Sequence, residues 1–331
     1  MRKSIYFIII FLVSVLFLEF LLRLLGFSPV VFSQKITWSP AIGYATDSLG
    51  INLKKGSYKI KINNCLEYTA THSEDGRRIT SKSSNLSKNK EKIYIFGCSF
   101  AYGVGVNDEE SFPFLLQGLE KNYQVENFAV PGSTTIHAYL NLKKKLENGG
   151  RPKIVVLSYG TFHEERTILT RGFESKLYNG IKFNKGFVLD KYLYPKCTIQ
   201  NNDVVVKSVN VIQDFQPIPF VDKSAIATFV DQTWNQLDQK RTDGFLASKL
   251  LMKKIGDLSN KYRFKLIIAD ISYNEHSKQI ESFCSSNQLK YINISPDYAV
   301  GNYSLEPCDF HPNQKAHQIY AQKLHEYLQH N

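Results

Sequence analysis

The chain opens with a long apolar stretch and then alternates between strand-like and helix-like patterns. Residues 4–27 include the run IYFIIIFLVSVLFL, which is long enough to cross a bilayer as one helix. Short strand-like segments lie at 93–96, 125–128, 153–158, 265–269 and 291–294, and helical patterns at 110–119, 134–146, 245–262, 276–287 and 312–329. Apolar strands joined by helices predict a mainly parallel five-stranded sheet with helices on both faces, a three-layer α/β/α sandwich.

The same patterns divide the chain into three parts. Residues 1–27 form a cytoplasmic stub and the apolar segment, residues 28–90 a juxtamembrane segment with a β-rich lead-in, and residues 91–331 the α/β domain. The lead-in is predicted to be β-rich because KIKIN at 59–63 alternates polar and apolar side chains. Residues 167–243 interrupt the strand–helix rhythm without a clear period. We interpret them as an insertion that either shapes the site or elaborates the structure.

Charged residues beside the apolar segment predict how it sits in a membrane. Arg2 and Lys3 precede it, which favours a cytoplasmic amino terminus and export of the remainder. Glu19 and Arg23 are four residues apart near its end, where both can reach lipid headgroups. A cleaved signal peptide is the alternative, but GFSPVVFSQ offers no clear small-x-small cleavage site. We expect a single-pass signal anchor with the α/β domain on the periplasmic or extracellular side.

Overall charge and cysteine spacing exclude two kinds of site. The net charge of +11 comes from 41 Lys and Arg against 30 Asp and Glu, and the lysines are scattered. Without a basic block or motif, a solvated basic surface is favoured over nucleic-acid binding. The five cysteines form no C-x-x-C pair, so a structural zinc site is not expected. We predict no metal and no cofactor.

Two separated segments carry the candidate chemistry. Ser99 follows the strand 93–96 at a point where a helix can begin, so the next backbone N–H groups are free to stabilise an oxyanion. Asp309 and His311 stand near the carboxyl terminus and can supply an orienting carboxylate and a base. The alternatives are structural, with Ser99 as a helix N-cap and His311 capping the final helix.

Taken together, these segments resemble the SGNH/GDSL hydrolase family. FGCSFAYGVGV is similar to its first block, with Ser99 at the serine, and NFAVPGST to its second, with Gly132 at the glycine. CDFHPNQKAH resembles its last block, with Asp309 and His311. The lead-in residues Asp75-Gly76-Arg77 and the segment VNDEESFPFLL also resemble membrane-anchored members. The resemblance runs from about residue 66 to the end, apart from the insertion, and implies the family's flavodoxin-like fold.

The resemblance implies acyl-serine chemistry. Ser99 would attack an ester carbonyl after His311 removes its proton, and Asp309 would hold the imidazole in the right tautomer. The backbone N–H groups of Ser99 and Gly132 would donate to the developing oxyanion. Such a mechanism uses no cofactor.

The third block departs from the family pattern Gly-x-Asn-Asp. If Gly160 aligns with its glycine, Phe162 takes the place of the asparagine, and a side-chain oxyanion donor is missing. His163 can donate instead, although a pocket wall without a catalytic role is an equal alternative. Arg166 can brace His163 or bind an anionic group of the substrate.

The first block departs as well, because Cys98 replaces the usual aspartate before the serine. Its side chain should point away from that of Ser99, so we do not expect it to be the nucleophile. Cys98 and Cys308 each precede a candidate catalytic residue, and a disulfide between them is a hypothesis that follows from that placement.

We therefore expect an exported, membrane-anchored serine esterase that removes O-acyl groups, and O-acetyl groups in particular, from cell-envelope glycans. An O-acyltransferase using the same serine is an alternative, because the residues do not show whether water or a sugar hydroxyl accepts the acyl group. A catalytically degenerate glycan-binding or assembly protein is a second alternative, which the missing asparagine favours.

Overall fold

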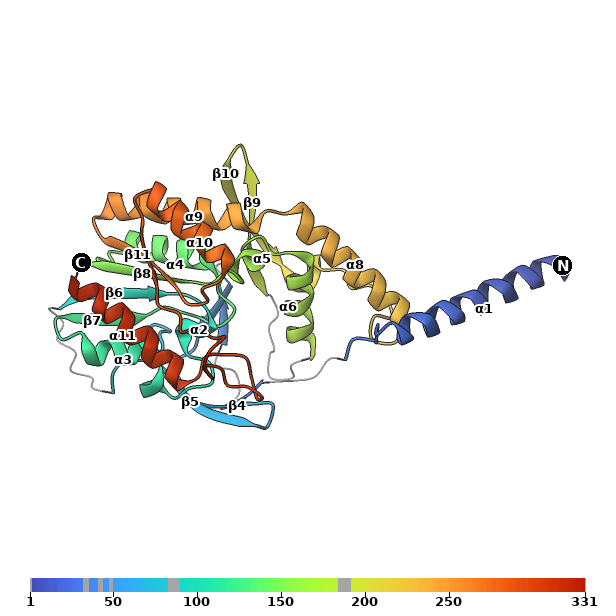
Figure 1. The fold of residues 1–331 in the computed structure, drawn as a ribbon, viewed down its shortest axis with the longest axis horizontal. Helices are drawn as coiled ribbons and strands as arrows, with labels where there is room; N and C mark the ends of the chain where they lie inside the picture. Colours follow the sequence, from blue (N-terminus) through green and yellow to red (C-terminus); the bar gives the residue numbers. More distant parts are fainter. Residues whose placement is uncertain are drawn as a thin grey trace.

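The α/β domain is built on the five-stranded parallel sheet that the apolar runs predict. The computed structural model describes residues 2–31, 36–40, 44–47, 50–82, 90–183 and 192–330. The strands are β6 (Glu91–Phe96), β7 (Tyr123–Asn127), β8 (Ile154–Tyr159), β11 (Lys265–Asp270) and β12 (Lys290–Asn293). They lie in the order β12-β11-β8-β6-β7, and every neighbouring pair is parallel (Figure 1). The order reverses between β6 and β8, which is where ligands bind in such sheets, outside the carboxyl ends of the strands.

Helices cover both faces of this sheet, which confirms the three-layer sandwich. The helices on one face are α3 (Phe112–Leu119) and α11 (Gln314–His330), and those on the other are α4 (Thr135–Glu147), α9 (Gly244–Tyr262) and α10 (Glu275–Ser286). Ile95 packs in the first core cluster together with Tyr320, whereas its neighbour Phe96 packs in the second together with Leu142. Adjacent strand residues thus enter opposite cores, as the pleat requires.

Two helix starts differ from the sequence prediction. The segment predicted as one helix at 110–119 divides into a 3-10 turn η1 (Asp108–Glu110) and α3, with Ser111 between them donating from its hydroxyl to the carbonyl of Asp108. The last helix begins at Gln314, so Pro312 precedes it instead of occupying its first turn. The side chain of Asn313 accepts from the N–H of Ala316 and caps that helix.

The lead-in contains two small antiparallel sheets and shares the core of the α/β domain. One sheet has the order β1-β4-β5, and the other pairs β2 with β3. The strands are β1 (Ile36–Ser39), β2 (Tyr44–Asp47), β3 (Gly50–Leu53), β4 (Gly56–Ile62) and β5 (Leu66–His72). Ile60, Ile62 and Tyr68 are buried in the same cluster as Ile95. Residues 83–89 of the lead-in lie outside the described residues.

The insertion is more regular than its sequence suggests, which corrects the expectation of an aperiodic segment. It contains α6 (Arg171–Phe183), a hairpin of β9 (Leu193–Gln200) and β10 (Asp203–Asn210), α7 (Val211–Asp214) and α8 (Ala225–Arg241). Asn201 and Asn202 form the hairpin turn with φ of 50° and 60°, the left-handed region that asparagine tolerates. Residues 184–191 lie outside the described residues.

The amino-terminal segment forms the helix α1 (Arg2–Leu24), which projects away from the rest of the protein (Figure 1). Its stretch Lys3–Leu24 is long and apolar enough to cross a membrane, and only 6% of its most apolar window is buried. A signal sequence has the same length and composition, so the helix alone does not separate an anchor from a cleaved signal.

Candidate active site

Ser99 lies at the start of a short helix directly beyond the carboxyl end of β6. This helix, α2 (Ser99–Tyr102), ends at Gly103, whose φ of 90° is left-handed and whose N–H donates to the carbonyl of Ser99 at 2.9 Å. A Cβ at Gly97 would lie 2.7 Å from that of Ala101, so the turn from strand to helix requires glycine there. Ser99 is 8% exposed. The sequence therefore places a mostly buried serine at the switch point of the sheet.

Asp309 and His311 form a close pair. The Nδ1 atom of His311 lies 2.7 Å from Oδ1 of Asp309, and the backbone N–H of His311 donates to the same oxygen. Burial raises the pKa of the Asp309 carboxyl, but the hydrogen bonds and charge of His311 outweigh it and hold that pKa below its ordinary value. An ionised carboxylate on Nδ1 leaves Nε2 of the ring available to a substrate or nucleophile.

The loop that carries this pair packs against the residue next to Ser99. The ring of Phe100 lies 5.6 Å from that of His311, between ring centroids. The exposed ring of Phe310 stacks on His311 at 4.4 Å. The structure thus joins Asp309 to His311 directly and brings His311 to the turn that begins with Ser99.

A disulfide holds the same loop, but it is not the predicted one. Cys308 is bonded to Cys65, which follows β4, so the hypothesis of a Cys98–Cys308 bridge is wrong. The side chain of Asn63 donates to the carbonyl of Cys308 at 2.9 Å and keeps that loop against the lead-in. Cys98 is instead a buried free cysteine in the core, where burial raises the pKa of its thiol. A buried neutral thiol is a poor nucleophile.

Gly132 has the backbone conformation that its predicted role requires. Its φ is 82°, a left-handed backbone conformation that favours glycine. A Cβ there would meet nothing within 4 Å, so a lack of space is not the reason for glycine at this position. The hydroxyl of Tyr194 donates to the carbonyl of Gly132 at 3.0 Å. The insertion therefore fixes the Gly132 peptide through Tyr194. No sequence signal indicated this tyrosine, because it lies in the stretch without clear periodicity.

His163 lies at the start of α5 (His163–Thr167) and is fully buried. Its ring is flanked by Tyr159 and Phe162 at 5.7 and 5.0 Å, and neither ring nitrogen has a hydrogen-bond partner among the described residues. Burial, with the charge of Arg166, lowers the pKa of His163 well below its ordinary value, so the ring is neutral. Its role as an oxyanion donor stays a prediction.

Arg166 is sandwiched between two aromatic rings. Its guanidinium lies 4.9 Å from the ring of Phe162 and 5.3 Å from that of Phe173. Among the described residues it forms no ion pair, and its buried Nε has no hydrogen-bond partner. Because Phe162 also packs on Phe100 at 5.0 Å, this positive charge lies one ring away from the residue that follows Ser99. An anionic group of a ligand would complement it.

Arg78 organises the glycine-rich loop after α2 and was missed by the sequence analysis. It is 1% exposed and donates to the carbonyls of Tyr102 and Val106 at 2.9 and 2.7 Å. It also forms an ion pair with Asp108 at 2.9 Å. The neighbouring Asp75-Gly76-Arg77 was noted only as part of a resemblance, and nothing in that motif distinguished the second arginine.

His137 is a buried histidine near the start of α4. The N–H of Thr134 donates to its Nδ1 at 3.2 Å, so the ring helps to cap α4. His317 is likewise buried, and it accepts from the N–H of Phe112 at 3.2 Å. Across the described residues, no group of three or more His, Cys, Asp or Glu side chains has the placement of a metal site.

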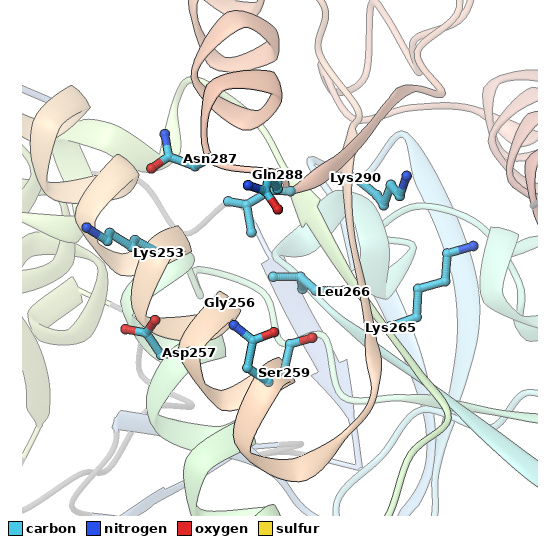
Figure 2. Close-up of a pocket in the computed structure, with 11 residues that line it drawn as sticks. Lys253, Gly256, Asp257, Ser259, Lys265, Leu266, Asn287, Gln288 and Lys290 are labelled. Atoms are coloured by element: carbon cyan, nitrogen blue, oxygen red, sulfur yellow. The ribbon is translucent and has the colours of Figure 1, made fainter.

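A separate cavity lies away from these residues. It has a volume of about 340 Å³ and is lined by Lys253, Lys265 and Lys290 among others (Figure 2). Lys265 and Lys290 are the first residues of β11 and β12, so the cavity is at the amino end of the sheet. Ser99 is at the carboxyl end, and the cavity is therefore not part of the candidate active site.

Several solved structures are similar to this chain. A lipolytic G-D-S-L family protein from Veillonella parvula is 13% identical, with 73% of this chain and 100% of that chain covered and a TM-score of 0.42. The psychrotrophic esterase EstA from Pseudoalteromonas sp. is 11% identical (73% and 98% covered, TM-score 0.39), and phospholipase A1 from Streptomyces albidoflavus is 10% identical (72% and 99%, TM-score 0.36). No family model and no curated protein matches the chain. An activity for this protein has to rest on its own residues.

Proposed function

We propose that this protein is a membrane-anchored serine ester hydrolase of the SGNH/GDSL kind. The observation that carries the proposal is the Asp309–His311 pair at 2.7 Å, packed through Phe100 against the turn that Ser99 begins. Carboxylate, imidazole and hydroxyl are the three groups of an acyl-transferring triad, and Ser99 stands at the switch point of a parallel sheet, where such sheets bind ligands.

The proposed mechanism has two steps. Nε2 of His311 takes the proton of Ser99, whose oxygen bonds to the ester carbonyl carbon, and the alcohol leaves with that proton. Water then attacks the acyl-serine with His311 again as base, which releases the acid and restores Ser99. Asp309 keeps the proton on Nδ1 and stabilises the imidazolium. The N–H groups of Ser99 and Gly132, with His163 as a third donor, stabilise each oxyanion.

The proposed substrate is an O-acylated glycan of the cell envelope, with acetyl as the acyl group. An exported domain would meet such esters. Among the described residues Arg166 has no ion-pair partner, and its charge beside Phe162 supports a glycan that carries an anionic group near the ester. Transfer to a sugar hydroxyl would use the same acyl-serine, and it differs only in what attacks that intermediate.

A degenerate binding protein is the second candidate, and the third block is the observation that favours it. Phe162 stands where the family carries an asparagine, and its ring covers His163. Loss of one oxyanion donor costs roughly 10²–10³ in rate. A protein with only the two backbone donors would still bind the ester but turn it over slowly.

We also propose that α1 stays attached as an anchor with the α/β domain outside the cytoplasm. Glu19 of α1 accepts hydrogen bonds from the N–H groups of Ala225 and Ile226, at the start of α8. A segment removed during export would leave those donors without this partner. The contact supports an anchor over a cleaved signal peptide.

The test is covalent labelling of the full-length protein in detergent with a fluorophosphonate probe. We expect one label per chain, its loss in Ser99→Ala, and its retention in Ser282→Ala, which removes an exposed serine. Hydrolysis of a simple acetate ester should follow the same pattern. A folded protein that neither labels nor cleaves the ester would overturn the proposed hydrolase and favour the binding protein.

A further inference from the structure

The anchor helix is joined to the domain by hydrogen bonds, not by a free tether. The carboxylate of Glu19 accepts from the hydroxyl of Ser224 at 2.8 Å and from the N–H groups of Ala225 and Ile226 at 2.8 and 3.0 Å. These donors are the N-cap and first residues of α8, which otherwise lack partners within the helix. A carboxylate is also favoured there by the helix dipole.

Further contacts fix the angle between α1 and α8. Arg23 pairs with Glu19 at 2.8 Å and donates to the carbonyl of Lys223 at 3.2 Å. The rings of Phe27 and Phe229 meet edge to face at 5.1 Å. Beyond them, the N–H of Val30 donates to the carbonyl of Val221 at 2.9 Å. Contacts spread over twelve residues of the chain restrict rotation far more than a single one would.

Exposed apolar side chains surround this joint. They are Leu25 (65% exposed), Val31 (87%), Phe220 (69%), Phe229 (41%) and Val230 (43%), and we call them the collar. Apolar and aromatic residues at the end of a membrane helix are typical of the bilayer interface, and cations such as Arg23 and Lys223 suit the headgroups. With α1 in the membrane, the bilayer surface meets the protein at the collar.

The other end of α8 reaches the wall of the active site. Asp238, near that end, accepts from the N–H of Arg171 at 2.7 Å. α9 then begins at Gly244, where a Cβ would lie 2.4 Å from the carbonyl oxygen of Glu164 in α5. The 17 residues of α8 correspond to about 25 Å. The helix α8 therefore leads from the collar to the wall of the active site.

The catalytic end of the sheet faces the anchor. Along the longest axis of the molecule, α2 lies between the strands and α1, while the carboxyl terminus lies on the far side (Figure 1). The amino ends of β11 and β12 are at the opposite end of the sheet, and the cavity lined by Lys253, Lys265 and Lys290 lies there.

From these observations we infer that α8 is a spacer that holds the active site toward the bilayer at a fixed height, and that the substrate is an acylated glycan linked to that membrane. This inference rests on the proposed hydrolase. Glycerolipid esters lie within the interface at the collar, at the opposite end of α8 from the active-site wall, and are out of reach. Sugars that extend outward from a membrane-linked carrier come to that height, whereas a detached glycan gains nothing from the orientation.

The orientation is tested by energy transfer in nanodiscs, independently of catalysis. A maleimide donor is placed on Phe310→Cys, beside His311, or on Lys290→Cys at the opposite end of the sheet, with acceptor dyes on lipid headgroups. Both positions are exposed, whereas the natural free cysteines are buried. We expect stronger transfer from position 310 than from position 290. Equal or reversed transfer efficiencies from the two positions would overturn the inference. An efficiency from position 310 as high as that of a dye in contact with the headgroups would also overturn it.

The joint is tested with Glu19→Ala in the same nanodiscs. Loss of the hydrogen bonds from the start of α8 to Glu19 should broaden the distribution of transfer efficiencies from position 310. Glu275→Ala, which removes an exposed carboxylate, should leave that distribution narrow. An unchanged distribution in Glu19→Ala contradicts a fixed height. If Glu19→Ala does not fold, Phe229→Ser removes the ring contact and is read in the same way.

The substrate is tested by turnover in the nanodisc. An acetylated glycan linked to lipid should be deacetylated at least tenfold faster than the same glycan after release from its lipid, and the bilayer phospholipids should stay intact. Equal rates, or release of fatty acid, would overturn the inferred substrate class. Fluorophosphonate labelling of Ser99 in the same sample separates this outcome from failure of the proposed hydrolase, because an inactive protein would not label.

Discussion

Arg78 donates to the carbonyl of Tyr102 at 2.9 Å from a fully buried position, and so ties the end of the lead-in to the turn that begins with Ser99. Its ion pair with Asp108 is equally buried. Arg78→Ala should therefore lower the free energy of unfolding by ~3–5 kcal/mol, because it leaves a buried carboxylate unpaired. Chemical denaturation measures this. Lys82→Ala, which breaks an exposed pair with Glu109, should cost less than about 1 kcal/mol, and similar losses in both variants would contradict the assignment.

Asp309 should matter for rate and not for folding. Asp309→Asn keeps the size of the side chain but no longer holds the required tautomer of His311, and turnover should fall by about 10⁴ while thermal stability changes little. Ester hydrolysis at saturating substrate measures the effect. Asp297→Asn is the matched control, because among the described residues that carboxylate accepts only from the N–H of Ala299. Turnover of Asp309→Asn near the wild-type value would remove the residue from the proposed triad.

His163 is expected to donate to the oxyanion even though its ring is covered in this structure. His163→Ala should reduce turnover by about 10²–10³ with little change in KM, because an oxyanion donor acts mainly in the transition state. His163→Gln, which retains a donor, should recover part of the loss. Wild-type turnover in His163→Ala would show that the ring is only a wall of the pocket.

Stability should fall on acidification below about pH 6.5. Burial lowers the pKa of His72 to about 4 and that of His317 to about 3, and it lowers that of His163 well below the ordinary value. Below pH 6.5 the unfolded chain therefore binds protons at these histidines, whereas the folded chain does not. Each such histidine therefore weakens folding by ~1.4 kcal/mol per pH unit between its unfolded and folded pKa.

The acid dependence can be assigned with one variant. His317→Asn retains an acceptor for the N–H of Phe112 and removes the titrating group. The slope of the free energy of unfolding against pH below 6.5 should therefore decrease by ~1.4 kcal/mol per pH unit, which corresponds to one proton. Denaturant titrations of the wild type and His317→Asn between pH 4.5 and 7.5 measure this slope, and equal slopes in the two proteins would contradict the assignment.

The disulfide predicts a specific thiol count. Denatured, unreduced protein should titrate three thiols of the five cysteines, because Cys65 and Cys308 are bonded. Cys65→Ser and Cys308→Ser should each lower stability by roughly 2–5 kcal/mol, and to a similar extent, since either removes the same bridge. Five free thiols in exported protein would contradict the bond.

Patterns local in sequence predicted most of the sheet and the position of each candidate catalytic residue. The strands β6, β8 and β11 contain apolar runs, and Ser99 and His311 lie in short recognisable segments, so their prediction does not depend on distant contacts. The pairing of Cys65 with Cys308 could not be predicted, because it depends on how the lead-in folds onto the loop 243 residues later. The roles of Tyr194 and Arg78 could not be predicted for the same reason, because each side chain donates a hydrogen bond to a backbone carbonyl of a loop distant in sequence.

The insertion was misjudged for a different reason. Its hairpin buries only part of each strand, so β10 has no regular alternation of buried and exposed positions. The two asparagines at the turn were the available signal, since paired left-handed residues are what a two-residue hairpin needs.

The lead-in sets the smallest portion of this protein that can stand alone. Ile60, Ile62 and Tyr68 fill the same core as the strand before Ser99, and Cys65 is bonded to the residue before Asp309. Cutting the chain at residue 91, where the parallel sheet begins, would expose one face of that core and release the loop of the proposed base. Any fusion, domain exchange or minimal expressed form must therefore begin upstream of β1, and the sheet with its helices is not a separable module.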